Sequence, residues 1–451
     1  MELGNFRDNL LNLDPMKFYD RKNEIEELRK ALDLSKKSAQ FTVVTGRRRI
    51  GKTTLVRKAY ENETLIYFFV ARKSEKELCA GFKKEIEQKL DIPILGEIGS
   101  FADIFEYLMK LSQKQSFTLF IDEFQDFFRV NPSVFSDMQR IWDEYHGKSK
   151  INLIVCGSIY SMMTNIFQNN KEPLYNRENR FMKIKPFKIE VLKEILKDFH
   201  PDYTSEDLLA LYLFTGAVAK YVTILMENGA LTRNEMIRQI INASSPFISE
   251  GKALLIEEFG KDYGIYFSIL TAIAAGKTSR SDIENTVGKE IGGYLTRLED
   301  HYEIISKHHP IFAKNTQRNI RYRITDNFLQ FWFRFVFRYQ YMVELDNYDA
   351  LRDVLERDYD TYSGLILERY FRQLLGESGR YTRIGSWWDR KGENEIDIVA
   401  ENELDKTLLI AEVKRNRKNY SEESLIRKSA AFFHSVGDFK DYTVRYEGLS
   451  L

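Results

Sequence analysis

The sequence predicts an α/β fold in which helices cover both faces of a parallel sheet, followed by helical parts and a second, smaller α/β region. Over the first half of the chain, short runs of β-prone apolar residues alternate with stretches of helical period. A glycine-rich turn joins the first of these runs to a helix. Because 451 residues exceed one ordinary core, we expect roughly two to four domains.

The composition is that of a folded globular protein without a strong overall charge. Lys plus Arg number 67 and Asp plus Glu number 67, so whole-chain charge does not argue for a nucleic-acid partner. Cys79 and Cys156 lie far apart in the sequence, which is typical of a reducing compartment. The most apolar stretch, 328–343, carries Arg334 and Arg338 and is too short to span a bilayer. We therefore expect a cytoplasmic protein with no membrane partner.

The glycine-rich turn follows residues 41–44 and has the pattern GxxxxGK[ST], with Gly46, Gly51, Lys52 and Thr53 at its fixed positions. Glycines let backbone amides approach phosphate oxygens, and the helix that follows adds its positive dipole end. We predict that Lys52 reaches the β- and γ-phosphates of ATP and that Thr53 offers a hydroxyl to Mg²⁺. The alternative is a glycine-rich turn that binds nothing. The predicted nucleotide-binding residues are Gly46, Arg47, Arg48, Arg49, Ile50, Gly51, Lys52, Thr53 and Thr54.

Two acidic residues, Asp122 and Glu123, end a second buried run, which we expect to lie beside the strand of the glycine-rich turn. In this position a carboxylate holds Mg²⁺, and a following Glu polarises the attacking water. The alternative is a strand that ends in two solvated acids. Ser158 follows the next apolar run, 151–156, and is predicted to sense the γ-phosphate, although Gly-Ser after a strand is also an ordinary turn.

Arg177 and Arg180 precede a short strand and are candidates for an arginine finger. A guanidinium stabilises charge on a transferred phosphoryl group, so either residue could act on the nucleotide of a neighbouring subunit in a homo-oligomer. A pair of solvated basic residues explains the pattern equally well.

The order of these motifs resembles the archaeal-type ATPase family, a branch of the AAA+ and STAND P-loop proteins that also occurs in bacteria. The matching segments are FYDR at 18–21, TGRRRIGKTTL at 45–55, FIDEFQ at 120–125, CGS at 156–158 and PLYNR at 173–177. The resemblance implies a P-loop NTPase sheet, and it continues into members with a winged helix and a nuclease-like tail. We place the ATPase core at 1–187, a helical lid at 188–262, a winged helix at 263–327, aromatic connecting helices at 328–360 and the tail at 361–451.

The winged helix-turn-helix is predicted from three helical stretches between 263 and 300, followed by strands at 304–307 and 321–324. The loop between the strands is basic, carrying Lys314, Arg318, Arg321 and Arg323. Such a wing can contact DNA phosphates, but winged helices also dock proteins.

The tail contains a second group of charged residues on two predicted strands. Side chains alternate across a strand, so Glu395 and Asp397 share one face, and Glu412 and Lys414 share one face of the next strand. A carboxylate within an apolar strand is costly unless it is paired with a cation or a metal. The pattern resembles the core of PD-(D/E)xK nucleases, a restriction-endonuclease-like α/β fold. That resemblance implies that Asp397 and Glu412 hold Mg²⁺, that Lys414 orients water and that Glu368 is the helix carboxylate.

A hairpin with a salt-bridged Asp–Lys pair, or a nuclease fold without catalysis, would give the same pattern in the tail, whose net charge is negative. The sequence therefore predicts a Mg²⁺-dependent ATPase coupled to a winged helix and a nuclease-like domain that acts on DNA. The alternative is a nucleotide-controlled binding switch with little turnover, whose tail docks nucleic acid or protein without cleavage.

Overall fold

The computed structural model describes residues 17–451 except 260–262, 314–318 and 438. The chain forms two compact units. One is Asp20–Pro186, and the other is Phe187–Leu451 together with the described residues before Asp20. Below, the first is called the ATPase unit and the second the C-terminal unit. None of the described helices is long and apolar enough to cross a bilayer.

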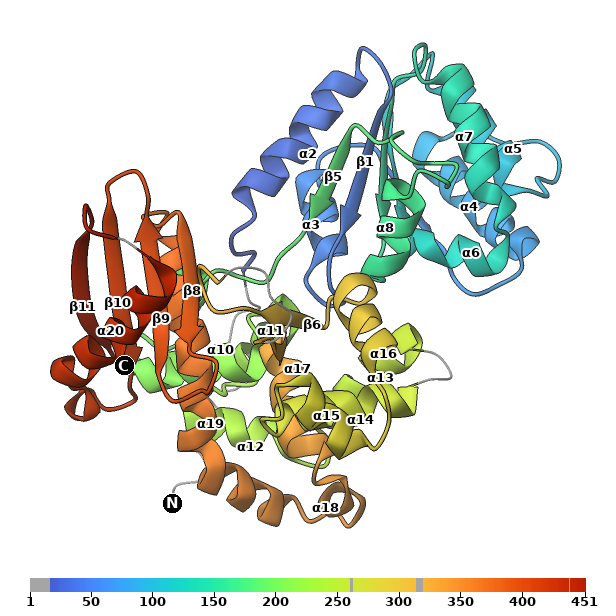
Figure 1. Cartoon of the computed structure of the whole chain (residues 1–451). Coiled ribbons are helices and arrows are strands. Elements are labelled where there is room, and N and C mark those ends of the chain that lie inside the picture. The colour runs from blue at the N-terminus through green and yellow to red at the C-terminus, as the bar shows by residue number, and fades with distance from the viewer. Residues whose placement is uncertain (1–16, 260–262, 314–318, 438) are drawn as a thin grey trace. The chain divides into compact units, whose positions relative to one another are not determined.

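The ATPase unit is a five-stranded parallel sheet with helices on both faces (Figure 1). Its strands are β1 (Gln40–Thr45), β2 (Leu65–Phe69), β3 (Phe117–Asp122), β4 (Ile151–Cys156) and β5 (Arg180–Lys183). Its helices are α2 (Lys22–Ser35), α3 (Lys52–Ala59), α4 (Glu75–Leu90), α5 (Phe101–Leu111), α6 (Phe127–Val130), α7 (Ser133–Tyr145) and α8 (Tyr160–Gln168). The predicted α/β fold with a parallel P-loop sheet is confirmed.

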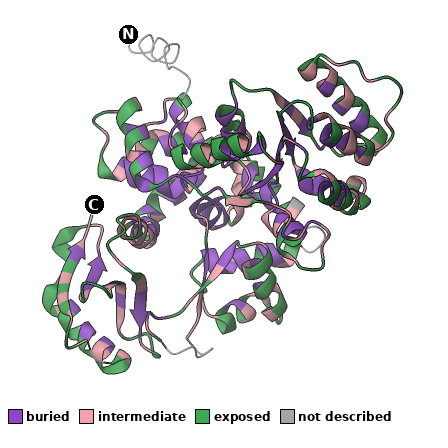
Figure 2. Ribbon diagram, turned by 90° about the horizontal axis from the view of Figure 1, so that it is seen from above, coloured by how far each residue is buried: buried purple, intermediate pink, exposed green. Residues whose placement is uncertain are grey.

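The strand order is β2-β3-β4-β1-β5, so β4 lies between the strand of the glycine-rich turn and the strand that ends in Asp122. The prediction that these two strands are neighbours was wrong, because order across a sheet depends on how the helical connections cross it and leaves no local mark in the sequence. Every residue of β1, β3 and β4 is buried, as expected for central parallel strands covered on both faces (Figure 2).

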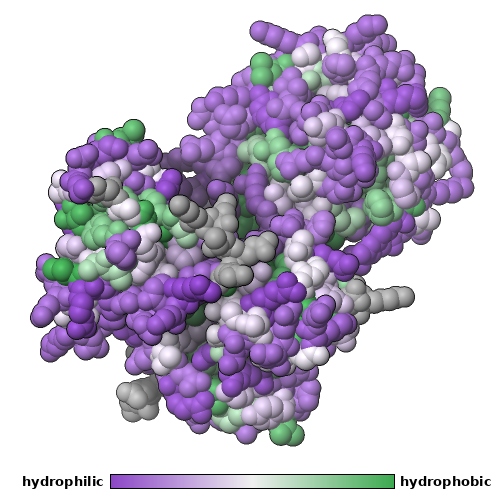
Figure 3. Space-filling model, in the orientation of Figure 1, coloured by the Kyte–Doolittle hydropathy of each residue, from purple (hydrophilic) through white to green (hydrophobic). Residues whose placement is uncertain are grey.

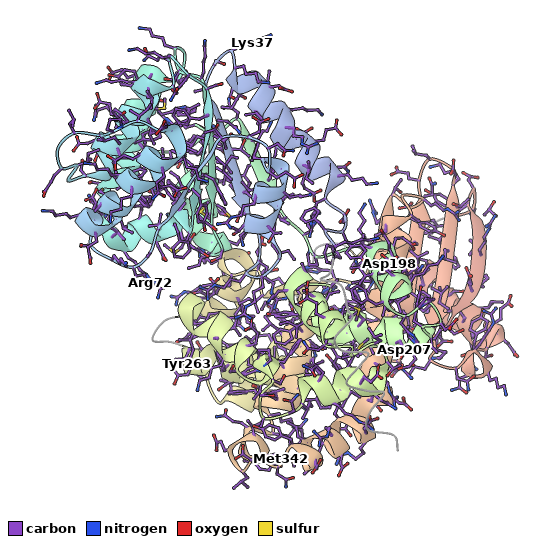
Figure 4. The ribbon with its side chains drawn as sticks, turned by 180° about the vertical axis from the view of Figure 1, so that it is seen from behind. Lys37, Arg72, Asp198, Asp207, Tyr263 and Met342 are labelled. Atoms are coloured by element: carbon purple, nitrogen blue, oxygen red, sulfur yellow. The ribbon has the colours of Figure 1, made fainter. Side chains whose placement is uncertain are left out.

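The C-terminal unit begins with helices over most of its first half. These are α9 (Ile189–Phe199), α10 (Ser205–Thr215), α11 (Ala219–Glu227), α12 (Arg233–Ile240), α13 (Pro246–Phe259), α14 (Tyr263–Ala274), α15 (Arg280–Val287) and α16 (Gly292–Thr296). A π-helical turn, Arg297–His301, continues α16. Thr204 caps α10 through a reciprocal bond with Asp207, which is labelled in Figure 4, and Gly216 ends the helix with a φ of 57°.

Two short antiparallel strands, β6 (Ile305–His308) and β7 (Arg321–Ile324), follow at the positions predicted for the wing. Next come α17 (Asn327–Phe331), a π-helical turn at Trp332–Phe337, α18 (Gln340–Glu344) and α19 (Tyr348–Glu377). The boundary expected at 360/361 falls inside α19, which runs without interruption for 30 residues.

The last part of the chain forms a four-stranded sheet of order β11-β10-β9-β8. Its elements are β8 (Arg383–Trp388), β9 (Glu395–Asn402), β10 (Thr407–Val413), α20 (Glu422–Val436) and β11 (Thr443–Leu449). β9 pairs antiparallel with both β8 and β10, and β11 pairs parallel with β10 after the α20 crossover. This mixed sheet corresponds to the C-terminal α/β region expected from the sequence. The visible surfaces of both units are mostly hydrophilic (Figure 3).

The described residues just after β6 pack against this sheet. Ile311 is buried in the same hydrophobic cluster as residues of β8, β9 and β10, and its N–H donates to the carbonyl of Ser386 at 2.8 Å. A Cβ on Gly385 would lie 2.9 Å from the Ile311 Cβ, so the close approach of the loop requires glycine there. Ile311 of this loop is therefore part of the hydrophobic core of the C-terminal sheet, whereas β6 and β7 form a separate two-stranded sheet.

Candidate functional site

The glycine-rich turn connects β1 to α3 in a backbone conformation that requires its two glycines. Gly46 has a φ of 141°, and a Cβ there would lie 2.6 Å from the Ile184 carbonyl oxygen. Gly51 precedes α3 with a φ of 93°. Both conformations are strained for any residue with a side chain, so the glycines set the path of the loop.

Lys52 is the first residue of α3 and is only 7 % exposed. Its ammonium donates to the carbonyl oxygens of Gly46 at 2.9 Å and Arg47 at 3.0 Å. The positive charge of Lys52 thus lies beside the loop backbone that we expect to bind the phosphates. Of the other predicted loop residues, Ile50 is buried, Arg47 and Arg48 are partly exposed, and Arg49 and Thr54 are exposed.

The two predicted Mg²⁺ ligands meet directly. The Thr53 hydroxyl donates to Oδ2 of Asp122 at 2.7 Å, although the residues are 69 positions apart. The Tyr67 hydroxyl reaches the same oxygen at 3.2 Å, and the N–H of Glu123 donates to Oδ1 at 3.0 Å. Hydroxyl and carboxylate oxygens are ligands that Mg²⁺ prefers, so the residues present fit this ion. Tyr67 was not identified from the sequence, because nothing local marks a strand tyrosine that faces a carboxylate.

Glu123 follows Asp122 in the left-handed backbone region, with a φ of 54°. Its Oε2 accepts hydrogen bonds from the Ser158 hydroxyl at 2.8 Å and the Gln125 amide at 2.5 Å. Ser158 thus lies one strand over from Asp122, as the sequence predicts, at the end of β4. Gln125 is a further neighbour that sequence reasoning missed, although it belongs to the FIDEFQ segment. A left-handed non-glycine residue at this position stores backbone strain, which is typical of functional sites.

The site has neighbours whose own ionisation is disfavoured. Burial raises the pKa of the Asp126 carboxyl, with Arg72 acting in the opposite direction and Glu123 adding to the shift. Figure 4 labels Arg72, whose Nε lies 3.6 Å from Asp126 Oδ2. Burial also raises the pKa of the Cys156 thiol well above its ordinary value. The Cys156 thiol therefore stays protonated and uncharged beside the site.

Arg177 and Arg180 lie away from the glycine-rich turn of their own chain. Arg177 pairs with Asp143 near the end of α7, with an N–O distance of 3.2 Å. Arg180 pairs with Thr42 in the strand register, near the start of β1, and donates to Gln40 at 3.0 Å. The turn follows the opposite end of β1, so neither arginine is placed to contact a phosphate bound there.

In the tail, the structure brings Asp397, Glu412 and Lys414 onto neighbouring strands. The register of β9 and β10 puts Glu412 opposite Asp397, whose Oδ2 accepts the Val413 N–H at 2.8 Å. Glu412 is 6 % exposed and accepts from Lys414 at 3.2 Å and Lys428 at 2.7 Å. Burial alone would raise the pKa of Glu412, but the bonds from Lys428 and Lys414 hold that pKa below its ordinary value. Lys428, on α20, is a partner that the sequence pattern did not identify.

Glu368 lies on α19 and faces Asp397. Burial first, and the negative charge of Asp397 second, raise the pKa of Glu368 to about 7. Arg323 of β7 opposes this shift, with its Nη1 4.0 Å from Glu368 Oε2. Among the residues that the structure describes, no group of three or more His, Cys, Asp and Glu side chains is placed to hold a metal ion.

Arg321 and Arg323, which were predicted to lie in a basic wing, face the tail. Arg321 binds Glu395 through both guanidinium nitrogens, at 2.6 and 3.2 Å, and lies 4.3 Å over the Trp388 ring. Arg323 is only 8 % exposed. These two arginines are thus paired within the chain and not presented to a phosphate backbone, which corrects the expectation of an exposed basic wing at these positions. Lys314 and Arg318 lie outside the described residues.

Two family models match the chain. One, described as an ATPase domain predominantly from Archaea, matches residues 18–225. The other, described as archaeal and bacterial proteins of unknown function, matches residues 332–426. The uncharacterized protein MJECL04 of Methanocaldococcus jannaschii is 31 % identical over 407 residues, which are 88 % of this chain and 87 % of the relative.

Solved structures with low sequence identity share the fold. The Walker-type ATPase PABY2304 of Pyrococcus abyssi superposes with a TM-score of 0.56 at 18 % identity, covering 72 % of this chain and 99 % of that one. The ORC2 protein of Aeropyrum pernix, determined as ADPNP and ADP complexes, superposes with a TM-score of 0.50 at 15 % identity, covering 77 % and 97 %.

Proposed function

The chain belongs to the family of ATPases found predominantly in Archaea, and from this premise we propose that it binds ATP with Mg²⁺, hydrolyses it, and uses the ATP state to control its C-terminal unit. The cytoplasm is the proposed location, where the free, buried thiols of Cys79 and Cys156 would stay reduced.

In the proposed reaction, the loop amides and Lys52 bind the phosphates. Thr53 and Asp122 would hold Mg²⁺, which supplies positive charge next to the β- and γ-phosphates. Glu123 accepts a proton from the attacking water while the water oxygen bonds to the γ-phosphorus and the bond to ADP breaks. Ser158 holds Glu123 in place through its hydroxyl and would respond to the γ-phosphate.

One observation carries this proposal. The hydrogen bond of 2.7 Å between Thr53 and Asp122 joins the end of β3 to the start of the helix behind the glycine-rich turn. A glycine-rich turn that binds nothing does not need a buried carboxylate at this point. Three neutral donors orient the Asp122 carboxylate, and they leave its negative charge for a cation.

Glu123→Gln tests hydrolysis directly. We expect kcat to fall by about 10²–10⁴-fold, because the amide cannot take a proton from water, while ATP stays bound and is recovered unhydrolysed. Glu395→Gln, the same change in the C-terminal unit, is the matched control and should leave ATPase activity unchanged. Wild-type activity no higher than that of Glu123→Gln would refute the proposed reaction.

We propose further that the working form is a homo-oligomer in which Arg177 or Arg180 reaches the nucleotide of a neighbouring copy. The location of both arginines away from their own glycine-rich turn supports this. Lys52→Ala removes the phosphate site and Arg177→Ala removes the finger, so a mixture of the two inactive variants should regain activity. No recovery with either Arg177→Ala or Arg180→Ala would exclude a finger in trans.

For the tail we propose docking of DNA or protein without cleavage as the function that the geometry supports best. The two lysines on Glu412 carry this choice, because a metal would have to displace them. Plasmid cleavage with Mg²⁺ or Mn²⁺ that disappears in both Asp397→Ala and Lys414→Ala would instead establish a nuclease. Gel-shift titration of the full chain in ADP and in ATP tests whether DNA is the docked partner.

A further inference from the structure

The two adjacent acids of the ATPase unit each have a neutral hydrogen-bond donor from outside the residues that the P-loop motifs define. Tyr67 of β2 reaches Asp122, and Gln125 reaches Glu123. Because neutral donors orient a carboxylate without cancelling its charge, they are suited to prepare it for a metal or a proton.

The position of Tyr67 is set by the sheet and by packing around its ring. In the parallel register Tyr67 lies beside Phe120 and Phe69 lies beside Asp122, so Tyr67 and Asp122 are diagonal neighbours on one face. The ring packs on Phe120, with centroids 5.3 Å apart, and the Arg57 guanidinium lies 4.5 Å over it. With the ring held by these two contacts, the hydroxyl donates to Oδ2 of Asp122, the oxygen that Thr53 also contacts.

Gln125 is held even more tightly, since it is 1 % exposed. A Cβ on Gly157 would lie 2.6 Å from its Oε1, so the amide fits only because residue 157 is glycine. Its Oε1 has no hydrogen-bond partner among the described residues, whereas its Nε2 lies 2.5 Å from Glu123 Oε2. The reverse amide orientation would put a carbonyl oxygen against a carboxylate, so the N–H group must face Glu123.

A buried acceptor without a partner is destabilising. The chain tolerates that cost in order to keep the amide donor on Glu123. With Gln125 and Ser158 both donating to Oε2, Oε1 is the oxygen available to take a proton from water.

We propose that Tyr67 and Gln125 are positioning residues that divide the acidic pair between two tasks, Tyr67 orienting Asp122 toward Mg²⁺ and Gln125 orienting Glu123 toward water. This rests on the proposed ATPase function. The division of tasks predicts that the two residues affect different kinetic parameters, which a purely structural role would not do.

The experiment compares Tyr67→Phe and Gln125→Met, which both keep the side-chain size and remove the donor. ATPase rates are measured against ATP and against free Mg²⁺, and fluorescent mant-ATP binding is titrated with and without Mg²⁺. Tyr145→Phe, which removes a hydroxyl bonded to Glu106 at 3.3 Å, and Gln340→Met, which removes an amide bonded to Glu344 at 2.8 Å, are the controls outside the site.

Tyr67→Phe should raise the half-saturating Mg²⁺ concentration about tenfold, both for activity and for the Mg²⁺-dependent part of mant-ATP binding. Its kcat at saturating Mg²⁺ should stay within about twofold of wild type. Gln125→Met should lower kcat about tenfold, with KM for ATP and the Mg²⁺ requirement unchanged. Gln125→Asn, which keeps an amide donor, should recover part of the lost kcat.

Parallel loss of both parameters in both variants, or no change in either, would overturn the inference. Unchanged mant-ATP binding without Mg²⁺ shows that a variant is folded, and a variant that loses this binding counts against a positioning role. A wild-type protein without ATPase activity would refute the proposed function, and the Mg²⁺ dependence of mant-ATP binding would still decide the role of Tyr67.

Discussion

The ATPase unit and the tail each place carboxylates on neighbouring strands, but they treat the negative charge differently. Among the described residues, the side-chain donors to Asp122 and Glu123 are all neutral. The donors are Thr53, Tyr67, Ser158 and Gln125. In the tail, Asp397 accepts a backbone N–H, but the partners of the other three carboxylates are cations. Glu395 binds Arg321, Glu412 binds Lys414 and Lys428, and Glu368 faces Arg323.

This difference distinguishes a site whose negative charge is available to a ligand from a network in which cations of the same chain offset most of the carboxylate charge. Neutral donors fix the direction of a carboxylate and leave its charge for a cation or a proton. An arginine or lysine removes most of that charge, and a buried pair is costly to break because the remaining partner stays uncompensated. On this ground the ATPase unit is the reactive part of the molecule, and the tail network joins the wing to the sheet.

The largest expected effect contrasts one carboxylate from each region. Asp122→Asn should lower ATPase activity by about a hundredfold or more, because charge stabilisation by the metal is lost. Asp397→Asn should leave it within about twofold. Steady-state rates at saturating ATP and Mg²⁺ measure both variants. Equal losses of activity would contradict the conclusion that only the ATPase unit is reactive.

An intermediate effect tests whether the tail network holds the wing. Arg321→Ala removes the paired hydrogen bonds to Glu395 and the contact with Trp388, together worth about 1–2 kcal/mol. Amides of β7 and β8 should then exchange with solvent about tenfold faster, while amides of β1 and β3 keep their wild-type rates. Hydrogen–deuterium exchange by mass spectrometry resolves the two regions, and Arg427→Ala, at an exposed position of α20, is the matched control.

The smallest effect concerns the pH dependence of the tail. The pKa of Glu368 is raised to about 7 in the folded chain, mainly by burial. Between the ordinary carboxyl pKa and pH 7, the folded state keeps a proton that the unfolded state has lost, so stability falls as pH rises through this window. Glu368→Gln should remove this fall and melt at least as high as wild type at pH 8.

Added Mg²⁺ or Mn²⁺ completes that test. If cations of the chain already pair with these carboxylates, added metal should not change the melting temperature of the tail at pH 8. A rise in wild type that is absent from both Glu368→Gln and Asp397→Asn would instead show a metal site and favour the nuclease.

The sequence predicts features of contiguous residues well, but it predicts poorly which residues from distant segments contact one another. The glycine-rich turn, the end of β3 at Asp122 and the hydroxyl of Ser158 follow from contiguous residues, and the structure brings them together. The position of β4 between β1 and β3, the hydroxyl of Tyr67 on Asp122 and the ammonium of Lys428 on Glu412 depend on which segments the fold makes neighbours. Arg321 looked like a DNA contact because its partner Glu395 lies 74 positions away.

The burial of Ile311 among the strands of the tail has a consequence for synthesis of the chain. Ile311 leaves the ribosome before Gly385, against which it packs. At about 5–20 residues per second, the loop has to wait several seconds for its binding surface. During that time its apolar side chain is exposed, so the wing cannot reach its final place until the β8–β9 hairpin has emerged, and a nascent chain that stalls in this interval is the form most open to aggregation or to capture by a chaperone.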